Sequence, residues 1–147
     1  MKHLKLLLSL LLFSVLSCKS NKKTVEFSFF TAGHIYGNPR DEAHPKGLYK
    51  PFTQKFKKLN EDKNMKFGVL LGDIVWKSEF WKEAELDISK LKMPVHYVRG
   101  NHDGKLDFFQ GKFGKTYKKF MYQNNLFIIL DTNIDKWNIL GDQLIFL

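Results

Sequence analysis

Three short polar clusters in this chain contain the residue types that bind divalent cations. They are Gly33-His34, Gly72-Asp73 and residues 100–103, and together they supply imidazole, carboxylate and amide oxygen donors. A hard-cation site requires such donors to be brought together from separate strands. The glycine before the donor lets the backbone turn tightly and leaves the pocket open. The pattern therefore predicts a metal site assembled from distant parts of the chain.

Each of these residues also has an ordinary structural interpretation when it is taken alone. Asp73 would be a turn or helix-cap aspartate, Asn101 a turn residue, and His102 or His34 an exposed loop histidine. Their recurrence at three successive strand ends favours a shared site. In addition, Asp103 is expected to hold the His102 imidazole in one tautomer and to support its charged form.

The elements that must position these clusters can be read from the apolar pattern. Strands are predicted at residues 24–31, 67–71, 95–98 and 126–130, and helices from Pro51 onward, at 79–91 and from Gly141 to Leu147. The segment between Asp103 and the last strand is expected to be irregular. Short apolar strands alternating with amphipathic helices indicate an α/β fold, a sheet covered by flanking helices. The carboxyl ends of such strands carry the site.

The motifs resemble those of the calcineurin-like metallophosphoesterase family. Gly72-Asp73 followed by Gly100-Asn101-His102-Asp103 has the order of that family's signature, and residues 130–133 and 141–144 resemble the family's segments on the carboxyl-terminal side of the signature. The resemblance covers about residues 25–147 and implies the family's phosphoesterase sandwich. Because the family's later histidine ligands lie beyond Leu147, residues 24–147 are expected to form a partial domain that lacks its carboxyl-terminal half.

The resemblance also implies a role for each residue. Asp73 would bridge two divalent metal ions, such as manganese, iron or zinc, with His34 on the first and Asn101 on the second. His102 would protonate the leaving oxygen or steady the phosphoryl group, and Asp103 would orient His102. The metals would activate a hydroxide for in-line attack on a phosphorylated small molecule or envelope component.

Two departures from the family pattern leave a second hypothesis open. Ala32 occupies the position of the family's first aspartate, for which Asp41, Glu42 or His44 would have to substitute, and no histidine follows Asp103. These departures favour an inactive relative that binds a glycan or a protein partner. The intact motif at residues 100–103 favours an enzyme.

The first residues resemble a secretion signal rather than part of the fold. A basic start and an apolar run, residues 6–16, lead to Cys18, the only cysteine in the chain. The pattern resembles a lipoprotein signal peptide at 1–17, with Cys18 as the lipidated residue and 18–23 as a tether. It implies anchoring to the membrane on the periplasmic or surface side of a bacterial envelope. The alternative is a plain signal peptide with an incidental cysteine.

The amino-acid composition argues against a disordered chain and against a nucleic-acid-binding protein. A hydrophobic fraction of 44% is sufficient for a globular core and argues against disorder. The net charge of +9 is carried almost wholly by lysine, since Arg40 and Arg99 are the only arginines. Nucleic-acid readers rely on arginine forks and exposed aromatic rings, so the charge indicates a solvated lysine-rich face and no nucleic acid is expected.

Overall fold

The computed structural model describes residues 26–38, 40–41 and 46–147. The predicted signal peptide, the lipidation residue Cys18 and the tether lie outside these residues, as do Glu42 and His44. Within the described part of the chain, no helix has the length and apolar character that crossing a bilayer would require.

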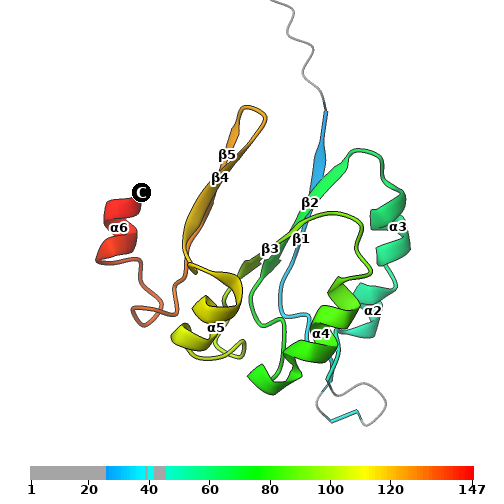
Figure 1. The fold of residues 1–147 in the computed structure, drawn as a ribbon, viewed down its shortest axis with the longest axis horizontal. Coiled ribbons are helices and arrows are strands. Elements are labelled where there is room, and N and C mark those ends of the chain that lie inside the picture. The colour runs from blue at the N-terminus through cyan, green and yellow to red at the C-terminus, as the bar shows by residue number, and fades with distance from the viewer. Residues whose placement is uncertain (1–25, 39, 42–45) are drawn as a thin grey trace, which may run out of the picture.

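A parallel sheet of three strands forms the centre of the fold. Strands β1 (Ser28–Ala32), β2 (Met65–Leu71) and β3 (Val95–Val98) lie in the order β1-β2-β3 (Figure 1). The middle strand is the most apolar, and its residues from Phe67 to Leu70 are buried. All three strands run the same way, so their carboxyl ends lie at one edge of the sheet. The predicted strands at 67–71 and 95–98 are thereby confirmed.

One face of this sheet is covered by helices α2 (Lys50–Thr53), α3 (Phe56–Glu61) and α4 (Trp81–Ile88), the last preceded by the 3-10 turn η1 (Ser78–Phe80). The larger apolar core lies here, where Leu70 packs with Phe56, Trp81 and Ile88. Pro51 lies in the first turn of α2, where proline is favoured because its fixed φ suits the helix and its missing N–H has no helical partner there. The helix predicted from Pro51 onward is divided into α2 and α3.

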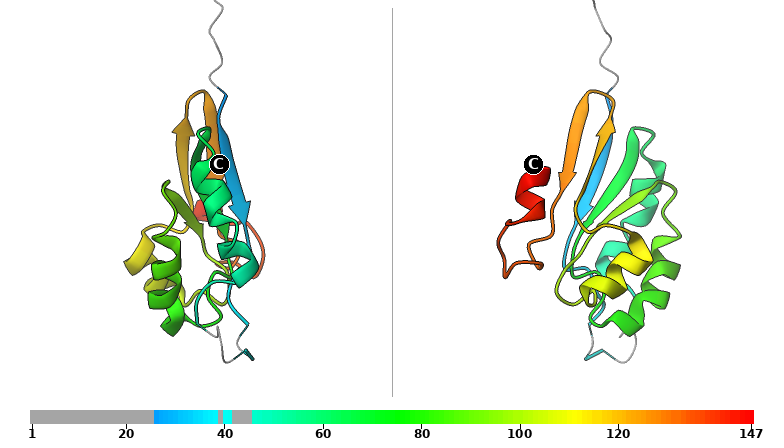
Figure 2. Two further views of the ribbon diagram at one scale, coloured as in Figure 1. Left: turned by 90° about the vertical axis from the view of Figure 1, so that its right-hand side faces the viewer. Right: turned by 60° about the vertical axis from the view of Figure 1, so that its left-hand side comes forward.

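The other face packs against an antiparallel hairpin of β4 (Lys118–Tyr122) and β5 (Asn125–Ile129), which follows helix α5 (Leu106–Phe113). Figure 2 shows this hairpin and the helices α2 to α4 on opposite sides of the sheet, and α6 (Asp142–Phe146) beyond the hairpin. The expectation of an irregular segment after Asp103 is therefore wrong. Alternation along β4 turns Phe120 and Tyr122 toward the sheet and leaves Met121 exposed.

An aromatic layer joins the hairpin to the sheet. The Phe67 ring on β2 lies 5.0 Å from Phe127 and 5.4 Å from Phe120, both edge-on. His96 on β3 stacks on Phe120 with 3.9 Å between ring centroids. These rings hold the end of β5 beside the end of β3, which brings residues after both strands to the same region.

His96 makes the stability of this layer depend on pH. Burial lowers the pKa of the His96 imidazole, and the charge of Lys118 lowers it further. The unfolded chain therefore binds the His96 proton more readily than the folded chain does. Above about pH 6.5 His96 is neutral in both states and does not change the free energy of unfolding, whereas below that value the free energy of unfolding decreases as the pH falls. In urea denaturation, His96→Phe should therefore lose less stability than the wild type between about pH 7.5 and pH 5.5. Equal losses in the two proteins would show that His96 is not responsible.

Candidate metal centre

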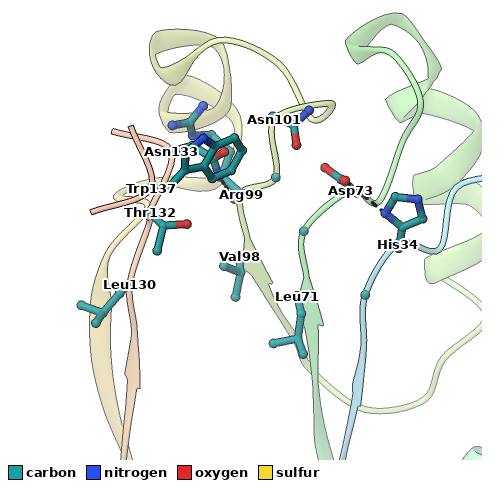
Figure 3. Close-up of a pocket in the computed structure, with 13 residues that line it drawn as sticks. His34, Leu71, Asp73, Val98, Arg99, Asn101, Leu130, Thr132, Asn133 and Trp137 are labelled. Atoms are coloured by element: carbon teal, nitrogen blue, oxygen red, sulfur yellow. Dashed lines mark hydrogen bonds and ion pairs between the residues drawn. The ribbon is translucent and has the colours of Figure 1, made fainter. Parts of the chain in front are cut away.

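The ends of β1 and β2 hold His34 beside Asp73. Backbone pairing continues past both strands, since His34 N–H donates to the Gly72 carbonyl and Ile35 N–H donates to the Asp73 carbonyl, each at 3.0 Å. The side chains then meet, with 3.2 Å between His34 Nδ1 and Asp73 Oδ2 (Figure 3). Two residues almost forty positions apart in the sequence thus form one pair, as their place at neighbouring strand ends predicts.

Both members of the pair have a backbone conformation that is unusual for their residue types. His34 has φ of 56° and Asp73 has φ of 51°, which is the left-handed region. A non-glycine residue there costs free energy, on the order of 1 kcal/mol, and such residues concentrate at functional sites. The backbone is therefore strained at two of the residues that were predicted from the sequence to be metal ligands.

Gly100 is required by the close approach of the loop after β3. A Cβ atom at this position would lie 2.2 Å from both the backbone nitrogen and the Oδ1 atom of Asp73. No side chain fits into that space, so only glycine lets the two loops meet. The contact explains why glycine precedes Asn101 in the motif.

Asn101 completes the group of predicted ligands. It lines an open cavity of about 350 Å³ together with His34 and Asp73. In Figure 3 the oxygen of its side chain is directed toward the Asp73 carboxylate, while His34 lies on the far side of that carboxylate. The structure thus brings together all three predicted metal ligands, from the ends of three different strands.

Asp103 does not act as the sequence suggested. Its carboxylate is fully buried and accepts three backbone hydrogen bonds, from Ile74 and Val75 at Oδ1 and from Gly100 at Oδ2, at 2.7–3.0 Å. Burial raises the pKa of this carboxyl, and the three N–H donors oppose that effect. Because both oxygens are used in this way, the predicted role of orienting the His102 ring is corrected: Asp103 joins the loop after β2 to the loop after β3.

His102 is held by Trp76 instead. Its Nδ1 atom lies 3.1 Å from the Trp76 carbonyl oxygen, and its ring stacks on the indole with 4.5 Å between centroids. A carbonyl only accepts hydrogen bonds, so Nδ1 carries the hydrogen and Nε2 is the nitrogen left for exchange of a proton. The backbone N–H of His102 also donates to Asp73 Oδ1 at 3.3 Å, which ties this residue to the candidate ligand.

The ends of three strands therefore present an imidazole, a carboxylate and an amide at one cavity. A comparison with protein-family models matches residues 34–145 to the calcineurin-like phosphoesterases. The chain belongs to this family. Comparison with curated proteins found no match, and comparison with solved structures found none either. Members of the family are hydrolases of phosphate esters, and the predicted α/β fold with a parallel sheet and flanking helices is confirmed.

A buried ion pair connects the end of β5 to the loop after β3, beside the cavity, and sequence reasoning missed it. The Arg99 guanidinium donates to both oxygens of Asp131, at 2.8 Å and 3.3 Å, and both side chains are buried. Gln143 of α6 bonds to the backbone N–H and carbonyl of Asp131, at 2.8 Å and 2.9 Å. Asn133 donates to the Arg99 carbonyl at 2.9 Å. The network fixes the end of β5 beside the residue that precedes Gly100.

Tyr36 is a further site residue that the sequence did not indicate. Its hydroxyl is hydrogen-bonded to His34 Nε2, so both ring nitrogens of His34 have a partner. Burial raises the pKa of Tyr36, and the negative charge of Asp73 raises it further. A cation ligated by His34 must therefore replace one of these two contacts.

The side chains that line the cavity include types that bind divalent cations. His34, Asp73 and Asn101 offer imidazole, carboxylate and amide oxygen, a combination suited to borderline and hard cations. Among residues 26–38, 40–41 and 46–147, no group of three His, Cys, Asp or Glu side chains could hold a metal. Ala32, in the place of the family's first aspartate, packs its methyl group against the core. Ala32 therefore supplies no metal donor where the family has its first aspartate.

Proposed function

We propose that this chain is a metal-dependent phosphoesterase in which His34, Asp73 and Asn101 bind a divalent cation. The observation that supports this most is the meeting of these three donors, from three strand ends, at one open cavity. One cation per chain is proposed because Ala32 offers no ligand where the family has its first aspartate, and the two-cation arrangement expected from the family resemblance stays a prediction.

In the proposed hydrolysis, the side chains around the cavity have different roles. A bound cation supplies Lewis-acid activation of water and neutralises charge on the phosphoryl group. Asp73 holds the negative charge that attracts the cation. Its carboxylate also accepts a hydrogen bond from the backbone N–H of His102, which fixes the loop after β3. His102 would act as an imidazolium that gives its Nε2 proton to the leaving oxygen and returns to the neutral ring, whose Nδ1 hydrogen is directed to the Trp76 carbonyl.

Hydrolysis of para-nitrophenyl phosphate tests this proposal. We expect turnover in the presence of Mn²⁺, loss of turnover after chelation by EDTA, and a decrease in kcat of about 100-fold or more in His102→Ala, which lacks the proton donor. His96→Phe is a control that removes a histidine elsewhere, because His96 lies in the aromatic layer and not at the cavity. Absence of turnover with Mn²⁺, Fe²⁺ and Zn²⁺ alike would instead favour the inactive binding protein.

A further inference from the structure

A second cavity, of about 600 Å³, opens directly beside the metal centre. The two cavities share Asn101 and Trp137 in their linings, so a ligand held at one reaches the other without leaving the protein surface. Figure 3 shows Trp137 on the side of the metal centre opposite His34. The second cavity is therefore an extension of the site and not a separate pocket.

The charge of this second cavity is positive. Lys105 and Lys136 line it, Arg99 lines it with its charge already paired to Asp131, and its lining includes no Asp or Glu. Neither lysine forms an ion pair with any residue in the described ranges. Asp135, the acidic neighbour of Lys136, lines a different cavity. Two lysine charges thus lie at a concave surface whose own lining includes no carboxylate.

The fold adds a second positive feature at the same place. Helix α5 begins directly after Lys105 and runs for eight residues. The first N–H groups of a helix have no partner within the helix, and they carry a partial positive charge. Asp107 in the first turn of α5 offsets part of this charge, so the main attraction for a negatively charged ligand comes from Lys105, which lines the cavity.

The loop that presents Trp137 is strained. Lys136 and Trp137 both have positive φ, 47° and 73°, although neither is glycine. The loop is held in this form by the Trp137 N–H, which donates to the Thr132 carbonyl at 2.8 Å, and by a bridge between Asp135 and Asn138. The indole that it presents remains 68% exposed. Strain that positions a large exposed ring beside an active site points to a ligand that the ring contacts.

We propose that this second cavity binds a second anionic group of the substrate, while the phosphate to be cleaved lies at the metal centre. The substrate class is then a phosphate ester whose leaving group carries another phosphate. Lys105 and Lys136 pair with that phosphate, and Trp137 covers the part of the molecule between the two. This inference rests on the proposed function, because it takes the metal centre as the place of cleavage.

Binding measured by calorimetry tests the subsite without requiring turnover. The probes are matched pairs that differ by one phosphate: fructose bisphosphate against fructose monophosphate, and adenosine bisphosphate against AMP. We expect the second phosphate to strengthen binding by about tenfold in each pair, the gain from two exposed ion pairs. If the second phosphate strengthens binding only in the adenosine pair, the preferred substrate is a nucleotide. If it strengthens binding in both pairs, the subsite accepts bisphosphates in general.

Variants then connect the gain to the named side chains. Lys105→Gln combined with Lys136→Gln should remove the preference for the bisphosphates and leave the affinity for the monophosphates unchanged. Lys92→Gln is the matched control, because this exposed lysine precedes β3 whereas Lys105 follows it at the other end. The part of the tryptophan fluorescence change that only the bisphosphates produce should be lost in Trp137→Phe, whereas Trp76, which stacks on His102, responds to monophosphates and bisphosphates alike.

Two results would overturn the subsite. One is equal affinity for the bisphosphate and monophosphate of both pairs, including the case in which none binds. The other is a preference that survives in the double lysine variant. Hydrolysis of para-nitrophenyl phosphate in the same preparation decides the proposed function separately. A bisphosphate preference without hydrolysis would leave the subsite standing and contradict the enzyme.

Discussion

Asp73→Asn is expected to abolish phosphate-ester hydrolysis while leaving the fold intact. The substitution keeps the size of the side chain but removes the negative charge that faces His34 Nδ1 at 3.2 Å. The cation loses its only carboxylate among the three proposed ligands, and charge stabilisation at such a centre amounts to several kcal/mol. We therefore expect kcat/KM for para-nitrophenyl phosphate to fall by about 1,000-fold or more.

The control for this variant is Asp107→Asn, which makes the same change at an exposed aspartate on the first turn of α5. Its kcat/KM should equal that of the wild type. Circular dichroism and urea denaturation should show that Asp73→Asn is folded. An Asp73→Asn protein that is folded and keeps more than about a tenth of the wild-type kcat/KM would contradict the assignment of Asp73 as a ligand.

Asp103→Ala is expected to have the largest effect on stability. Removal of this buried carboxylate leaves the N–H groups of Ile74, Val75 and Gly100 without their acceptors. Each buried, unsatisfied donor costs about 1–3 kcal/mol, and water that enters the space recovers part of the cost. We expect the free energy of unfolding to decrease by about 3–5 kcal/mol, measured by urea denaturation.

Asp103→Asn provides the graded comparison. Its remaining oxygen still accepts from one side, while its NH₂ group faces an N–H that has lost its acceptor, so the loss should be roughly half that of Asp103→Ala. Asp107→Ala should change stability by less than about 0.5 kcal/mol, because Asp107 is exposed. A loss in Asp103→Ala as small as in Asp107→Ala would show that the carboxylate does not hold the two loops together.

The sequence was sufficient to predict the sheet and the meeting of the ligands. Buried parallel strands read as short apolar runs, as at 67–71, and ligands at the ends of such strands share an edge because the strands are parallel. Both features follow from local pattern and a general rule of topology. The glycine at position 100 could be read in the same way, since its reason is a close backbone approach.

Features that depend on tertiary contact could not be predicted. The pairing of Arg99 with Asp131 and of Asp131 with Gln143 joins β3, β5 and α6, and no local pattern indicates it. Because Asp103 is adjacent to His102 in the sequence, it was predicted to orient the His102 imidazole. The tight turn instead directs the Asp103 carboxylate into the interior. Strand β4 was missed because its lysines and its exposed Met121 obscure the alternation of two inward rings.

Equilibrium titration of the chain with Mn²⁺, followed by electron paramagnetic resonance of the free ion, tests the metal centre most directly. We expect that one cation binds per chain, that Asp73→Asn abolishes this binding, and that Asp107→Asn retains it. Binding of the same strength in Asp73→Asn, or no binding by the folded wild-type chain, would contradict the claim that the ends of the three parallel strands form a metal centre.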